Sequence, residues 1–97
     1  MEEELQKIKR WSSRGTLRQF YTEVSAKAST KGYKAELDGS TITFYRTRKE
    51  GGFLGIGART IKEPVLKIIR HDDTVEIPED SIDEAFVREL AGSLRQH

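Results

Sequence analysis

Basic side chains bracket a glycine-rich apolar stretch near the middle of this 97-residue chain. Residues 46–62 read RTRKEGGFLGIGARTIK, with lysine and arginine on both sides of four glycines. Lysine and arginine neutralise phosphate groups and release counterions, while an aromatic ring offers a surface on which a base can stack. The residues that could make such contacts are Arg46, Arg48, Lys49, Arg59, Lys62, Tyr45 and Phe53. We therefore expect this stretch to bind nucleic acid, either RNA or single strands.

The apolar tip of the same stretch supports a second hypothesis. Phe53, Leu54 and Ile56 stand between glycines in what the pattern predicts to be a seventeen-residue loop, residues 46–62. Loops of that length are usually functional or disordered. The three side chains either cover the core or insert into a partner. The alternative function is therefore a protein-interaction or homodimerisation module, whose apolar contact would depend little on salt.

The glycine-rich stretch also resembles a known signature. GGFLGIGAR, followed by IKEPVLKI, is similar to the K-G-F-L-G-I-G-x-K/R…V-x-V pattern of the small N-terminal domain of Jag-type RNA-binding proteins. Gly51 stands where that family has lysine, and an additional hairpin precedes the motif. The resemblance implies a glycine-rich turn between two strands and an RNA-associated setting, and it transfers no RNA-contacting residue to this chain. The matching positions are Gly52, Phe53, Leu54, Gly55, Ile56, Gly57 and Arg59.

Residue types suited to catalysis or metal binding are not arranged in a recognisable set. His71, Asp72 and Asp73 occupy a predicted tight turn, where successive side chains diverge and do not converge on an ion. The glycines do not fit a dinucleotide fingerprint, because a third glycine after Gly55 and Gly57 would be needed where Thr60 stands. We therefore expect a non-enzymatic module without catalytic residues, metal or cofactor.

The composition indicates a polar, folded chain with separated charge. Residues 1–62 carry 13 Lys/Arg against 7 Asp/Glu, and residues 63–97 carry 4 against 9, so the two parts differ in sign. Such asymmetry favours either an acidic partner or attraction between the two parts, within one fold or between copies of the chain. The absence of cysteine and of an apolar run of about 20 residues, together with an acidic N-terminus, predicts a cytoplasmic protein without a membrane partner.

Helical signals occur at both ends of the chain. Apolar periodicity predicts helices at residues 3–11, 17–31 and 81–95. Thr16 with Gln19, and Ser81 with Glu84, have the spacing of a capping box, in which each side chain satisfies a backbone amide of the first turn. The buried stripe of the last helix is expected to contain Ile82, Ala85, Phe86, Leu90 and Leu94.

Two hairpins are expected between the long helices. Asp38-Gly39 predicts a two-residue type I′ turn that pairs Leu37 with Ser40. Asp72-Asp73 predicts a second turn, with Pro64 and Pro78 at the strand margins. The fold class is therefore α+β, a two-layer domain with a four-stranded antiparallel sheet and two main helices on one face. Residues 1–15 form an N-terminal helix or arm, and residues 16–97 form a single domain.

Overall fold

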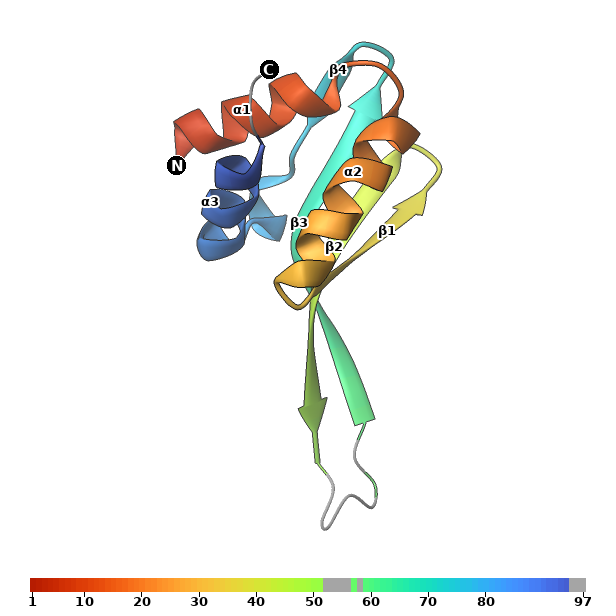
Figure 1. Ribbon diagram of the computed structural model, residues 1–97, viewed down its shortest axis with the longest axis vertical. Coiled ribbons are helices and arrows are strands. Elements are labelled where there is room, and N and C mark those ends of the chain that lie inside the picture. The colour runs from red at the N-terminus through yellow and green to blue at the C-terminus, as the bar shows by residue number, and fades with distance from the viewer. Residues whose placement is uncertain (52–56, 58, 95–97) are drawn as a thin grey trace.

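The computed structural model describes residues 1–51, 57 and 59–94. A four-stranded antiparallel sheet with strand order β1-β2-β3-β4 carries its helices on one face, so the predicted α+β fold is confirmed (Figure 1). The elements in chain order are α1 (Glu2–Ser12), α2 (Leu17–Thr30), β1 (Tyr33–Asp38), β2 (Thr41–Glu50), β3 (Arg59–His71), β4 (Thr74–Glu76), the 3₁₀ turn η1 (Glu79–Ser81) and α3 (Glu84–Ser93).

One apolar core lies between the helices and the sheet. Phe44 of β2 is fully buried, and its ring lies 5.0 Å from that of Phe86 on α3. Tyr33 of β1 packs on the same Phe86 ring at 4.6 Å. Helix α1 contributes Ile8, which is also fully buried. The N-terminal helix is therefore packed into the same core as the sheet.

The start of α2 agrees with the sequence, whereas the start of α3 corrects it. Both hydrogen bonds of the predicted capping box between Thr16 and Gln19 are present. For α3 the N-cap is Asp83, whose carboxylate accepts a hydrogen bond from the Phe86 amide at 3.1 Å. The predicted cap, Ser81, ends the η1 turn and donates its hydroxyl to the Pro78 carbonyl.

The later start of α3 also changes which residues are buried. Ala85, expected in the core, is exposed, while Val87 is fully buried. Aspartate and serine are comparably good N-caps, so either could begin this helix. Ser81 is part of the η1 turn that follows Pro78, so Asp83 caps α3 instead.

The β1–β2 hairpin has the predicted faces with a different register. Leu37 pairs with Ile42 and Asp38 with Thr41, so the connecting residues are Gly39 and Ser40. The prediction that Leu37 pairs with Ser40 is therefore wrong. Of the two connecting residues, only Gly39 has a positive φ, of +60°. A type II′ turn requires a positive φ at its first central residue alone, whereas the predicted type I′ turn requires it at both. The β3–β4 hairpin turns at Asp72 and Asp73, as predicted.

Strands β2 and β3 extend far beyond the sheet, which corrects the predicted seventeen-residue loop. Pairing continues from Arg46 with Glu63 to Glu50 with Arg59, so most of the expected loop is a two-stranded ribbon (Figure 1). We call residues 46–50 and 59–63 the arm. The pattern was misread because its strands carry charged residues on both faces, which hides the alternation that marks a half-buried strand.

A β-bulge marks the base of the arm. Phe44 pairs with Leu66, while Tyr45 pairs with Pro64, so Val65 is an extra residue on β3. Bulges bend a strand and increase its twist, and the ribbon leaves the sheet at this point (Figure 1). Pro64 therefore lies inside β3 and not at its margin, at an irregularity where a missing amide does not break the ladder. The Val65 carbonyl accepts a hydrogen bond from the Asp83 amide at 2.8 Å.

Candidate nucleic-acid interface

The arm projects from the domain without contributing to its core. The molecule measures 48 × 25 × 25 Å, and its long axis follows the arm (Figure 1). Within the described part of the chain, no buried hydrophobic residue lies between positions 45 and 64. An isolated two-stranded ribbon is at best marginally stable in water. The arm must therefore be held in place by contacts between its own side chains and by its connection to the sheet.

The alternation of side chains gives the arm two different faces. Successive residues of a strand point to opposite sides, and directly paired residues share a side. The arginine face continues the helix-covered side of the sheet, and the lysine face continues its open side. The arginine face carries Arg46, Arg48, Glu50, Arg59, Ile61 and Glu63. The lysine face carries Thr47, Lys49, Thr60 and Lys62, and it follows Tyr45 in the open sheet.

Ion pairs connect the charged residues of the arginine face. The Arg48 guanidinium lies 2.6 Å from a Glu63 oxygen and 3.0 Å from Glu50. Arg59 lies 4.0 Å from Glu50 across the two strands. At the base of the arm, Arg46 reaches Glu63 at 3.6 Å and the Asp83 carboxylate at 3.5 Å. These contacts join the two strands and fix the arm against the start of α3.

The arginine face is consequently almost neutral. Arg46, Arg48 and Arg59 stand against three carboxylates, Glu50, Glu63 and Asp83, all within 4.0 Å of at least one guanidinium. Individual pairs of this exposure contribute little to stability, of the order of 0–1 kcal/mol each. Networks hold geometry better than isolated pairs, and here they orient the arm.

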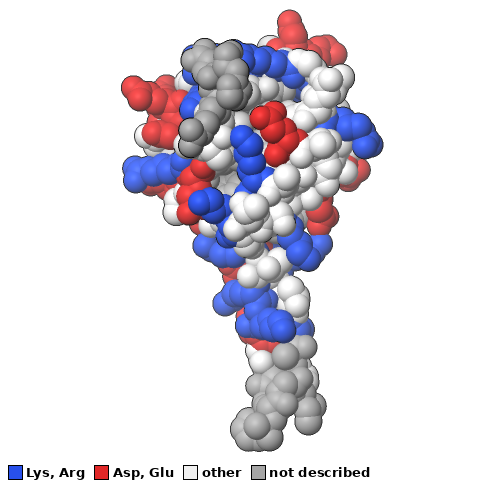
Figure 2. Space-filling model, viewed as in Figure 1, with Lys and Arg blue, Asp and Glu red and all other residues white. Residues whose placement is uncertain are grey.

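The lysine face has fewer acidic neighbours. Lys62 pairs with Glu36 of β1, 2.5 Å from ammonium to carboxylate, and lies over the Tyr45 ring, 5.4 Å from its centroid. Among the described residues, no carboxylate lies within 4.0 Å of the Lys49 ammonium. Figure 2, which views the helix-covered side, shows lysine and arginine gathered where the arm leaves the domain, with acidic side chains between them. The uncompensated positive charge of the arm therefore lies mainly on the lysine face.

The pair between Lys62 and Glu36 has a measurable electrostatic signature. The hydrogen bond that the Lys62 ammonium donates to Glu36, and then the negative charge of Glu36, raise the pKa of Lys62 above the ordinary value of 10.5. A raised pKa in the folded state means that the pair stabilises the protein fully below pH 10.5 and loses this effect as the pH rises through the folded-state pKa. NMR titration of the Lys62 side chain should therefore give a pKa above 10.5. In Glu36→Gln this rise should disappear, whereas an unchanged Lys62 titration would contradict the pairing.

Beside the arm, the open face of the sheet is hollowed. The hollow has a volume of about 570 Å³ and lies between the strands and the η1 turn. Tyr45 and Pro64 border it on the side of the arm, and Lys67 is part of its wall. Its full lining is Thr43, Tyr45, Pro64, Lys67, Ile69, Pro78, Asp80 and Ser81. The hollow is large enough for a small planar group and is continuous with the lysine face through Tyr45.

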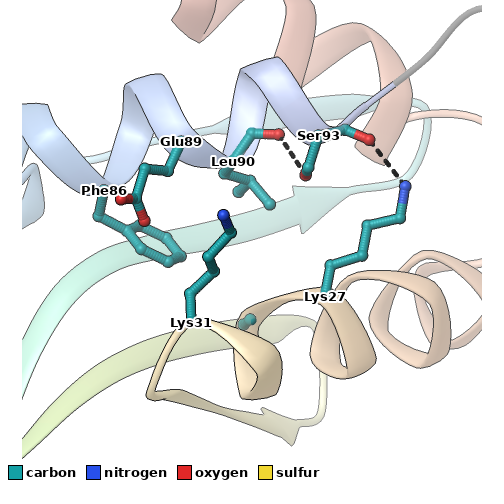
Figure 3. Close-up of a pocket in the computed structure, with 7 residues that line it drawn as sticks. Lys27, Lys31, Phe86, Glu89, Leu90 and Ser93 are labelled. Atoms are coloured by element: carbon teal, nitrogen blue, oxygen red, sulfur yellow. Dashed lines mark hydrogen bonds between the residues drawn. The ribbon is translucent and has the colours of Figure 1, made fainter.

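A second depression lies between α2 and α3 and is too small for a ligand. Its cavity is about 10 Å³, close to the minimum for a single water molecule. Figure 3 shows Lys27 and Lys31 reaching from α2 towards α3. The Lys27 ammonium donates to the Ser93 carbonyl at 2.8 Å, at the C-terminal end of α3, where a positive charge suits the helix dipole. This contact joins two helices and belongs to the packing of the domain.

His71, at the turn between β3 and β4, makes a local contact with an acidic side chain. His71 Nε2 lies 2.9 Å from a Glu76 carboxylate oxygen across the β3–β4 hairpin. In the described residues there is no group of three or more metal-capable side chains placed to hold an ion.

None of the helices that the structure describes has the length and apolar character needed to cross a bilayer.

The structure separates the residues that the sequence grouped. Arg46, Arg48 and Arg59 lie on one face of the arm, and Lys49 and Lys62 on the other, next to Tyr45. Phe53, Leu54 and Ile56, together with most of the stretch that resembles the Jag signature, lie outside the described residues. Lys67, which lines the hollow, was not among the residues expected from the sequence. Its pairing with Thr43 next to Tyr45 was available only once the strand register was known.

Comparison with known proteins gives no relative from which function could be transferred. The chain matches no protein-family model, no curated protein and no solved structure. The geometry and charge of the arm and of the open sheet face are therefore the features that indicate function.

Proposed function

We propose that this protein is a small non-enzymatic module that binds nucleic acid through the arm and the adjoining sheet. The observation that carries this proposal is a projecting ribbon with five cations and two carboxylates. The cations are Arg46, Arg48, Lys49, Arg59 and Lys62, and the carboxylates are Glu50 and Glu63, a balance of +3. A ribbon that contributes nothing to the core and carries net positive charge is suited to contact a polyanion.

Size and shape also support this function. The arm has two strands about 4.8 Å apart, so its side chains reach a ligand from two sides of a narrow element. The lysine and arginine side chains on such an element can bind successive phosphates of a nucleic-acid backbone and release its counterions. The expected partner is RNA or single-stranded nucleic acid in the cytoplasm, as the sequence indicates.

The proposal predicts binding that weakens steeply with salt. Fluorescence anisotropy of labelled 12-nucleotide U and dT oligomers should show saturable binding at low salt. With about four phosphate contacts, the logarithm of the association constant should fall with the logarithm of salt with a slope of about −3, at roughly −0.7 per contact for single strands. An absence of binding to these oligomers and to a 12-base-pair duplex at low salt would overturn the proposal.

The alternative function, a protein-interaction or dimerisation module, is distinguished in the same experiments. Apart from Met1, which is 38% exposed, the described residues contain no exposed large hydrophobic side chain. The alternative consequently depends on Phe53, Leu54 and Ile56. Self-association that persists at high salt and is lost in the Phe53→Ser, Leu54→Ser double variant would favour it over nucleic-acid binding.

A further inference from the structure

The two faces of the arm differ in how far their charges are already satisfied. On the arginine face, three guanidinium groups stand against Glu50, Glu63 and Asp83, a balance of zero. On the open side of the sheet, near the arm, there are four lysines and two carboxylates, a balance of +2. These residues are Lys34, Lys49, Lys62, Lys67, Glu36 and Asp80. A phosphate that approaches the arginine face must break existing ion pairs, whereas one at the open side meets less compensated charge.

The four lysines are spread along the direction of the strands. Lys67 is paired with Thr43 and Lys34 with Tyr45, and Lys62 and Lys49 lie further out on the arm. From Thr43 to Lys49 the strand rises about 3.3 Å per residue, so the lysines extend over roughly 20 Å. Two other carboxylates of this face, Asp38 and Glu76, lie level with Thr41 at the opposite end of the sheet. The positive part of the open face is therefore an elongated strip.

An aromatic ring and a hollow lie within this strip. Tyr45 is half-buried, and it lines the hollow of about 570 Å³ together with Lys67. Aromatic rings in a positively charged groove bind single strands because each unpaired base has a flat face available for stacking. In a duplex the bases are already stacked on each other and offer only their edges. The combination of ring, hollow and lysine strip thus favours a single strand over a duplex.

We propose that a single-stranded nucleic acid binds along this open face, with one base in the hollow against Tyr45 and its phosphates on Lys34, Lys49, Lys62 and Lys67. This inference rests on the proposed function and states which face performs it. The paired arginines of the arginine face hold the arm in position and do not contact the nucleic acid. Lys62 exchanges Glu36 for a phosphate on binding and moves away from the Tyr45 ring, over which it lies at 5.4 Å.

Two matched triple variants test the choice of face. Lys49→Ala, Lys62→Ala, Lys67→Ala and Arg46→Ala, Arg48→Ala, Arg59→Ala each remove three positive charges, so their effects on the overall field are equal. We expect the lysine variant to lose at least about tenfold more affinity for U and dT 12-mers than the arginine variant. Tyr45→Ala should lose roughly tenfold, as expected for one stacked base. Equal losses, or a larger loss in the arginine variant, would overturn the inference.

Single substitutions that neutralise one carboxylate on each face disturb the arm less than the triple variants do. Glu36→Gln and Glu50→Gln each remove one negative charge, but Glu36→Gln releases Lys62, whereas Glu50→Gln releases Arg59 and leaves Arg48 paired with Glu63. We expect Glu36→Gln to bind the 12-mers several-fold more tightly than Glu50→Gln does. The reverse order would place the strand on the arginine face.

The outcomes separate this inference from the function on which it rests. If the wild-type protein binds neither single strands nor a 12-base-pair duplex, the nucleic-acid function itself fails. If it binds the duplex more tightly than the 12-mers, or binds the 12-mers through the arginine face, the function stands and this inference is overturned. Chemical shifts of the Lys62 side chain and the Tyr45 ring on addition of the 12-mer report the same contact directly, and neither should move if the strand lies elsewhere.

Discussion

Removal of the arm should leave a folded domain that binds nucleic acid only weakly. Replacing residues 47–62 with Asn-Gly joins Arg46 to Glu63, which are directly paired, through a two-residue turn of the kind that closes hairpins. Because no described core residue lies between positions 45 and 64, the thermal midpoint should change little. The affinity for 12-mers should fall more than tenfold because several phosphate contacts are lost. Each lost contact should also reduce the salt slope by about one unit.

The shortened protein also provides a check on where binding occurs. It keeps Lys34, Tyr45 and Lys67 on the open sheet face and loses Lys49 and Lys62. Residual weak binding with a shallower salt dependence should therefore remain. Circular dichroism and the dispersion of the amide NMR spectrum establish whether the domain is folded. Full affinity in a folded protein without the arm would contradict the proposed function of the ribbon.

The largest loss of stability is expected for Phe44→Ala. Phe44 is fully buried, lies in β2 at the base of the arm, and packs at 5.0 Å on the Phe86 ring. Truncating a buried phenylalanine removes its transfer free energy and leaves a cavity, at a cost of about 3–5 kcal/mol. Native domains have only about 5–15 kcal/mol in total, so the variant should be close to unfolding. Urea denaturation followed by circular dichroism measures the change.

A matched control for this substitution lies one residue earlier in the same strand. Thr43 points to the open face and is only partly buried, so Thr43→Ala should change the free energy of unfolding by less than about 1 kcal/mol. If both variants lost similar stability, strand propensity and not core packing would explain the effect. A small loss in Phe44→Ala alone would mean that the aromatic contact with Phe86 is not central to the core.

Several elements could be predicted from the sequence because their signals are local. The capping box at Thr16 and Gln19 and the turn at Asp72 and Asp73 depend on residues a few positions apart, and both are present. The apolar side of the first hairpin was also predicted correctly, since alternation determines the face of a strand whatever its exact partner. These signals were sufficient for the α+β class and for two successive hairpins, whereas the strand order β1-β2-β3-β4 is known only from the structure.

Register and the extent of the arm could not be predicted in this way. A shift of one residue in the turn changes the partner of Leu37 from Ser40 to Ile42. Ile42 and Phe44 stay on the buried face in either register, so the apolar pattern does not select between the two. The bulge at Val65 likewise depends on contacts with residues far along the chain, such as the Asp83 amide.

For the candidate site, the sequence determined which residues carry charge, and the tertiary structure decided which charges are compensated. The five cations around the glycine-rich stretch were evident from composition alone. Strand pairing placed the arginines beside Glu50, Glu63 and Asp83, and it placed the lysines beside Tyr45 on the open face. Electrostatic interactions act through space, so partners remote in sequence control how strongly each side chain can bind an anion.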